Sequence, residues 1–177
     1  QTTYDFSTIA TLSFGVAGAG IWNTQANITI GGVNYILTSS GNGSFSNVSS
    51  GGESNSKALK KDGSGGDSFT LARVDGQPFQ FYGIWVSHQS MNSYCQVYTL
   101  PPWYTLSTTG AESFSYQDMT PMTAGTAWNN YTSSSISISS GSGGKKVTSV
   151  AISIQAILSY TIDNIIVGPA AGGNPVI

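Results

Sequence analysis

The stretch "LSYTIDNIIVG", residues 158–168, combines apolar and β-branched residues in a pattern typical of a buried β-strand. Asp163 and Asn164 stand in the middle of this strand. A carboxylate in such surroundings is costly to bury unless hydrogen bonds or a metal ion compensate for its lost hydration. The segment therefore raises two linked questions: which strands pair with it, and what holds Asp163.

Strand patterns dominate the rest of the chain. Segments with alternating or continuous β-branched and aromatic residues occupy 26–30, 33–39, 68–74, 79–87, 95–100, 135–139 and 147–157. Gly- and Ser-rich clusters that are typical of turns lie between them, and no window of a dozen residues carries an uninterrupted helical stripe. Many short strands joined by Gly-rich turns indicate an all-β sandwich or barrel.

Composition narrows the class of protein further. The chain has 177 residues, enough for one domain with a core, and only 8% of them are charged, against about a quarter in a typical protein. The net charge of −2 and the six Lys and Arg residues argue against nucleic-acid binding. We interpret the pairs Lys60-Lys61 and Lys145-Lys146 as solvated loop lysines next to Gly-rich turns. No run of about 18 apolar residues predicts a membrane span.

The segment "FQFYGIWV", residues 79–86, is the most aromatic of the expected strands. Strict alternation places Phe79, Phe81 and Trp85 on one face and Tyr82, Ile84 and Val86 on the other. We expect either a central strand covered on both faces or a strand that offers aromatic side chains to a groove.

The two ends of the chain share a pattern. "TTYDFST" near the N-terminus and the strand around Asp163 each carry an Asp among aromatic and β-branched residues, so we expect them to pair as neighbouring strands. The composition changes after Gly168, and we expect residues 1–168 to form the domain and 169–177 a Pro/Gly tail or linker. The start at Gln1 and the Ser/Thr/Asn-rich surface favour a secreted protein.

Four stretches together resemble a known family, the secreted bacterial β-sandwich domains of jelly-roll type whose architecture is similar to that of carbohydrate-binding modules. The resemblance implies an antiparallel two-sheet jelly roll with adjacent N- and C-terminal strands and an extracellular or cell-surface location. It is carried by "YDFST", "GGDSFTLARVDGQPFQFYGIWV", "VTSVAIS" and "YTIDNIIVG".

The same resemblance suggests a role for Asp163. In carbohydrate-binding jelly rolls, an acidic residue of the last strand commonly helps to hold a structural calcium ion that fastens the chain ends. It therefore implies Asp163 as a calcium ligand, with Asp5 as a weaker partner. The alternative is that Asp163 caps a turn or accepts backbone N–H hydrogen bonds near the strand end.

Residues suited to catalysis are few. The chain contains one histidine, His88, and one cysteine, Cys95, which excludes multi-histidine zinc sites and thiolate clusters. No G-x-S-x-G motif is present, and most of the eight acidic residues lie in turn-like segments. We expect a protein that is not an enzyme.

Aromatic residues suited to binding are plentiful. They make up 11% of the chain, and several lie in segments too polar to be plain core. Aromatic faces flanked by amides and hydroxyls form the kind of pocket that takes a sugar ring. The alternative is that the tryptophans plug the open ends of the sandwich. The predicted ligand platform consists of Trp103, Tyr104 and Trp128, helped by Asn129, Asn130 and Gln89.

Two functions of different class remain open at this point. One is a non-catalytic secreted or cell-surface module for binding or adhesion, with glycans as its partners. The other is a self-assembling structural subunit of an extracellular filament or surface layer, joined by strand donation or sheet-edge contacts. The low charge favours the second, because charge is one of the features that prevents edge-to-edge strand pairing.

Overall fold

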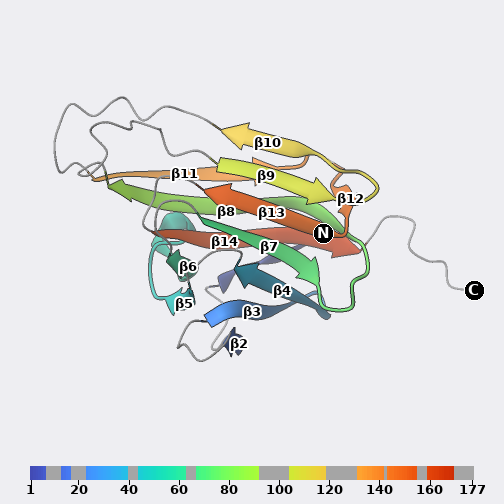
Figure 1. The fold of residues 1–177 in the computed structure, drawn as a ribbon, viewed down its shortest axis with the longest axis horizontal. Helices are drawn as coiled ribbons and strands as arrows, with labels where there is room; N and C mark the ends of the chain where they lie inside the picture. Colours follow the sequence, from blue (N-terminus) through green and yellow to red (C-terminus); the bar gives the residue numbers. More distant parts are fainter. Residues whose placement is uncertain are drawn as a thin grey trace, which may run out of the picture.

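A computed structural model of the protein describes residues 1–6, 13–16, 23–39, 44–62, 67–91, 104–118, 131–141, 143–154 and 159–169. Within these ranges there is no α-helix, and fourteen strands form two seven-stranded antiparallel sheets that face each other (Figure 1). The expected fold class, an antiparallel two-sheet sandwich of jelly-roll type, is confirmed.

Sheet A contains the strand around Asp163. Its strand order is β11-β8-β14-β6-β5, with β1 also paired to β14 and β12 also paired to β8. Its strands are β1 (Thr2–Tyr4), β5 (Phe45–Val48), β6 (Ala58–Asp62), β8 (Phe79–Met91), β11 (Tyr131–Ser139), β12 (Lys145–Val147) and β14 (Ser159–Pro169).

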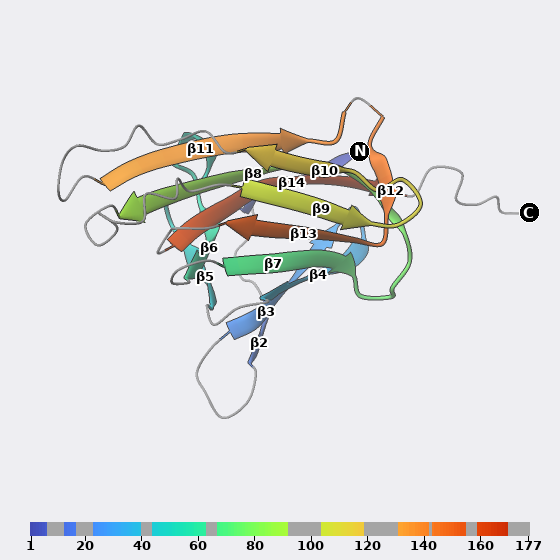
Figure 2. The same ribbon diagram turned by 45° about the horizontal axis from the view of Figure 1, so that its top comes forward.

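Sheet B forms the second layer, and Figure 2 shows its strands β7, β9 and β13 lying in front of sheet A. Its strand order is β10-β9-β13-β7-β4-β3-β2. Its strands are β2 (Ser13–Val16), β3 (Asn23–Ile30), β4 (Val33–Ser39), β7 (Asp67–Arg73), β9 (Tyr104–Thr109), β10 (Ser115–Asp118) and β13 (Ser149–Ile154).

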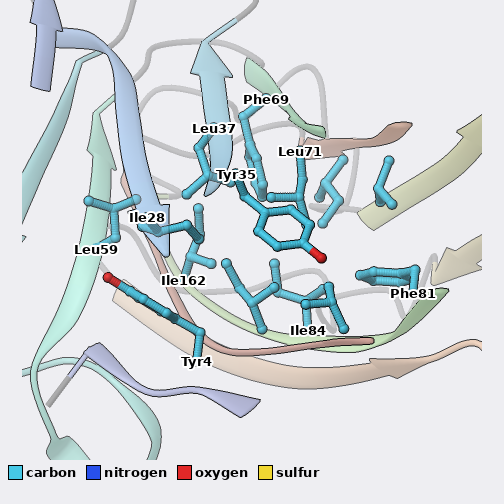
Figure 3. Packing of buried hydrophobic residues seen from close by; sticks show 14 of the residues in the cluster. Tyr4, Ile28, Tyr35, Leu37, Leu59, Phe69, Leu71, Phe81, Ile84 and Ile162 are labelled. Atoms are coloured by element: carbon cyan, nitrogen blue, oxygen red, sulfur yellow. The ribbon is translucent and has the colours of Figure 1, made fainter. Parts of the chain in front are cut away.

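The core lies between the two sheets. Apolar side chains on the inner face of each strand meet there, as strands with one buried face require. Figure 3 shows Tyr35, Leu37 and Leu71 of sheet B facing Ile84 and Ile162 of sheet A, and all five are buried. Aromatic rings cross between the sheets in edge-to-face geometry, which adds to the gain from buried area.

Strand β14 is shared among three partners. β8 pairs with it along one side, whereas on the other side β6 pairs with residues 159–162 and β1 pairs with residues 165–167. The expected pairing of the chain ends is thereby confirmed, with Thr2 opposite Val167. The partner changes at Asp163 and Asn164.

A β-bulge marks the same place. Tyr160 and Ile162 point into the core before it and Ile165 and Val167 after it, so the alternation of faces shifts by one residue. Asn164 takes a φ of 46°, a left-handed conformation that Asn tolerates better than most residues.

The alternation expected for β8 is wrong. Phe79 and Phe81 are buried in the core, but so are Ile84 and Val86. The phase changes near Gly83, where the pairing of β8 with β14 is irregular. A Cβ atom on Gly83 would lie 2.5 Å from the carbonyl oxygen of Ile138, so this close approach of two strands requires glycine.

The interpretation of the lysine pairs as loop residues is also wrong. Lys60 and Lys61 lie in β6, and Lys145 and Lys146 form most of β12. Lys61 is fully buried, and its Nζ lies 5.6 Å from the centre of the Phe45 ring, within the range of a cation–π interaction. Lys61 is buried because of its position in β6, and its proximity to a turn does not expose it.

The buried tyrosine of β1 predicts how stability depends on alkaline pH. Burial disfavours the phenolate and raises the pKa of Tyr4 to about 12. Unfolded tyrosine ionises near pH 10, so only the unfolded state releases this proton as the pH rises from about 10 to 12. We expect the free energy of unfolding to fall across this window, and to fall less steeply in Tyr4→Phe, as measured by urea denaturation.

Burial also raises the pKa of Tyr35, although nearby Arg73 opposes this effect. Tyr35→Phe therefore serves as a second probe, and the remaining slope of Tyr4→Phe should decrease further when both substitutions are combined. An unchanged slope in Tyr4→Phe would contradict the assignment.

Candidate functional site

The side chain of Asp163 lies where β14 changes partner, and it is 1% exposed. Its Oδ1 accepts hydrogen bonds from the backbone N–H groups of Phe6 (3.4 Å) and Asn164 (2.9 Å). Its Oδ2 accepts hydrogen bonds from the backbone N–H of Glu53 (3.1 Å) and the hydroxyl of Ser56 (2.9 Å). One carboxylate thus joins the N-terminal segment, the β5–β6 connection and the last strand.

The β5–β6 connection, residues 49–57, is held against β14 by further contacts. Thr161 donates its hydroxyl to the carbonyl oxygen of Gly51 at 2.6 Å, and the amide of Asn164 donates to the carboxylate of Glu53. Gly52 allows the close approach, because a Cβ atom there would lie 2.5 Å from Oδ2 of Asp163. The connection therefore packs directly against the carboxylate.

These surroundings do not fit calcium. An ionised carboxylate has about four lone-pair positions, and four donors already point at Asp163. Calcium requires about six to eight oxygen ligands, usually several of them carboxylates. In the part of the chain that the structure describes, no three His, Cys, Asp or Glu residues cluster as a metal site would require.

Asp5, the weaker ligand expected, is partly exposed and precedes Phe6 in the chain. The geometry at Asp163 corresponds to the alternative interpretation, a carboxylate that accepts backbone N–H hydrogen bonds. Calcium bound by Asp163 and Asp5 stays a prediction, which thermal unfolding with and without calcium can test.

The outer face of sheet A presents a different kind of site along β8. Tyr82 and Trp85 are partly exposed, and their inward neighbours Phe81, Ile84 and Val86 are buried, so both rings point away from the core. On the adjacent strand β11, the exposed Ser137 and Ser139 lie opposite Trp85 and Gly83. We define the β8 face as Gln80, Tyr82, Trp85, Ser137 and Ser139.

Two glycines border the ring of Tyr82. A Cβ atom on Gly144, just before β12, would lie 2.9 Å from Cε1, and one on Gly168 in β14 would lie 3.2 Å from Cε2. Both glycines are buried, so the ring occupies the space that side chains of the two flanking strands would otherwise fill. The Tyr82 hydroxyl donates to Oε1 of Gln80 at 3.1 Å, which fixes the ring's orientation.

The chemistry of the β8 face is that of an uncharged, amphipathic surface. It combines two aromatic rings, one amide and two hydroxyl groups, and none of its five side chains is charged. Such a surface can stack against an apolar face of a ligand while hydrogen bonding its hydroxyl groups.

Most residues of the ligand platform predicted from the sequence lie outside the described ranges. Trp103, Trp128, Asn129 and Asn130 lie outside them, and the side chains of Tyr104 and Gln89 are not described. As strand positions, Tyr104 opens β9 in sheet B and Gln89 lies in β8 of sheet A.

The topology nevertheless brings the ends of the two aromatic-rich segments together. Segment 92–103 starts after Met91, which pairs with Tyr131, and ends before Tyr104, which pairs with Asp118. Segment 119–130 runs from Asp118 back to Tyr131. The ends of β8, β9, β10 and β11 that flank these segments lie on the same side of the sandwich (Figure 1).

Sequence reasoning missed Tyr82 and Trp85 as a shared surface. Alternation placed them on opposite faces, and only the irregular pairing at Gly83 brings them to the same one. A signal was present in the sequence, since glycine within an aromatic strand often marks a bulge.

Comparison with known proteins finds distant structural similarities. No family model and no curated protein matches the chain. Among solved structures, the chain is similar to the carbohydrate-binding module TmCBM61 in complex with β-1,4-galactotriose, at 15% identity and a TM-score of 0.36, over 76% of this chain and 88% of that one.

A second similar structure is the carbohydrate-binding module CBM6cm-2 of Cellvibrio mixtus lichenase 5A in complex with cellotriose, at 14% identity and a TM-score of 0.33, over 75% and 90% of the two chains. A third is the enzymatically active domain of bacteriophage CBA120 tailspike protein 4, at 11% identity and a TM-score of 0.34, over 76% of this chain. The chain spans only 19% of that structure.

Separately, no helix in the described ranges has the length and apolarity needed to span a bilayer.

The Asp163 contacts predict a large effect of a nearly isosteric change. In Asp163→Asn, one oxygen becomes an NH₂ group that faces N–H or O–H donors, and the charge that strengthens the other bonds is lost. We expect the free energy of unfolding to fall by about 2–4 kcal/mol in urea denaturation. Asp75→Asn is the matched control: Asp75 is exposed and pairs with Arg73 at 2.5 Å, so its replacement should change stability little.

Metal removal gives a separate prediction. Because four donors already occupy Asp163, we expect the thermal unfolding midpoint to be the same in excess chelator and in excess calcium. A midpoint that rises with calcium in the wild type and not in Asp163→Asn would overturn this expectation and establish the calcium site.

Proposed function

We propose that this protein is a non-catalytic, secreted or cell-surface module that binds neutral glycans and thereby serves in attachment or adhesion. The observation that carries the proposal is the ring of Tyr82, fixed between Gly144 and Gly168 on the β8 face beside Trp85.

The form of the β8 face favours an oligosaccharide over a single sugar. Tyr82 and Trp85 are three residues apart on one strand, which corresponds to roughly 10 Å at the usual rise per residue. A ligand that stacks on both rings must be longer than one sugar ring. Ser137 and Ser139 on the neighbouring strand could then bond hydroxyl groups along the ligand.

Charge favours neutral over acidic glycans. None of the five side chains of the β8 face is charged, although Lys146 of β12 lies opposite Gln80 at its border, and the chain as a whole has a net charge of −2. An acidic polysaccharide would require several cationic side chains at the contact to offset its desolvation.

The platform predicted from the sequence, with Trp103, Tyr104 and Trp128 helped by Asn129, Asn130 and Gln89, is kept as a second candidate glycan site. Its support is topological, since the described ends of segments 92–103 and 119–130 are paired to each other. Strands β8 and β11 carry part of the β8 face and run from it to the paired residues Met91 and Tyr131, which flank this second candidate.

Affinity electrophoresis in gels that contain soluble neutral polysaccharides tests the proposal. We expect the wild type to be retarded by at least one neutral polysaccharide, and both Tyr82→Ala and Trp85→Ala to weaken binding about tenfold or more. Tyr82→Phe, which keeps the ring, should bind nearly as well as the wild type.

The matched control is Tyr116→Ala, which removes a partly buried tyrosine of β10 in sheet B and should leave retardation unchanged. If Trp103→Ala or Trp128→Ala abolishes retardation while the variants of the β8 face retain it, the site is the second candidate. If none of the polysaccharides retards the wild type, glycan binding is refuted.

A further inference from the structure

The edge of sheet A formed by β11 offers a surface for another strand. β11 pairs with β8 along its whole length, from Tyr131 opposite Met91 to Ser139 opposite Gly83. It is the last strand in the order of sheet A, and none of the other described strands pairs with its second edge. That edge presents backbone N–H and C=O groups that can pair with an added strand.

β11 lacks the features that usually protect an edge. Its sequence, "YTSSSISIS", contains no charged residue, no proline and no glycine over nine residues. Natural sheets protect their edges with charge, proline, bulges or very short strands. The other terminal strands of the two sheets, β2, β5 and β10, have four residues each. β11 is therefore the long, unprotected edge among the described strands.

We propose that β11 pairs in antiparallel orientation with β11 of a second copy of this chain, so that the two sheets A become one continuous sheet. A twofold axis through the middle of the strand places β11 against itself, which makes the contact self-complementary. With Ser135 on the axis, Ser133 faces Ser137 and Thr132 faces Ile138. No charge faces another in this arrangement, and pairs of hydroxyl and β-branched residues suit adjacent strands.

The proposed pairing has a consequence for the arrangement of the outer faces. Antiparallel extension of a sheet about a twofold axis perpendicular to it leaves the same face of both copies on the same side. The two β8 faces would then lie next to each other across the new strand pair. The pairing itself does not depend on glycan binding and is tested without a glycan.

Sedimentation equilibrium across a wide range of protein concentration tests the pairing. We expect the wild type to move from the monomer mass to twice that mass as concentration rises. Ser135→Lys places two ammonium groups opposite each other at the axis and should weaken self-association about tenfold or more. Ser107→Lys is the matched control, because Ser107 is exposed in β9, which already pairs with β10 and β13 on its two sides.

Hydrogen exchange of wild-type β11 amides gives a readout that does not depend on any variant folding correctly. Their protection should increase with protein concentration, whereas amides of the interior strand β13 should not change. A protein that stays monomeric at every concentration, or a dimer that Ser135→Lys leaves intact, overturns the proposal. Protection of β11 that does not depend on concentration also overturns it, since another segment of the same chain would then cover the edge.

Discussion

The sandwich depends on how backbone hydrogen bonds are satisfied at the point where β14 changes from one partner strand to another. β14 has β8 along one side, but β6 and β1 each cover only part of the other side. Backbone N–H groups of Asn164 and of the flanking residues Phe6 and Glu53 meet where these partners change, and buried N–H groups require acceptors. Asp163 supplies acceptors for three backbone N–H groups and one hydroxyl, so it closes the gap with a single side chain.

This arrangement explains why an acidic residue interrupts an apolar strand. A carboxylate accepts without donating, so it suits a site where every neighbour donates. If one continuous strand paired with this side of β14, no carboxylate would be needed at position 163. The bulge at Asn164 belongs to the same solution, because it returns Ile165 and Val167 to the core directly after Asp163.

Much of the fold could be predicted from the sequence, because period-two patterns and Gly-rich turns are local properties. The pairing of the chain ends followed from two similar strands. The faces of β8 could not be predicted, since its phase shift near Gly83 accompanies its irregular pairing with β14. The burial of Lys61 likewise depends on its place in β6, and not on the turn that follows.

The candidate site was harder to predict than the fold. Trp103 and Trp128 were predicted to bind a ligand because they lie in polar segments. Tyr82 and Trp85, in contrast, lie in a strand whose sequence is typical of a buried core. The position of the Tyr82 ring depends on the glycines beside it. Gly144 and Gly168 come from segments distant in the sequence, and only the assembled sheet places both beside one ring.

The location of the two chain ends has a practical consequence. Thr2 and Pro169 lie on neighbouring strands, at the end of β8 that carries Phe79 and away from the end that carries Met91 (Figure 1). A tether fused at either position would leave the sandwich from that side. Immobilised in this way on a sensor chip or a bead, the molecule would present the opposite ends of β8 and β11, at Met91 and Tyr131, outward to the surrounding solution.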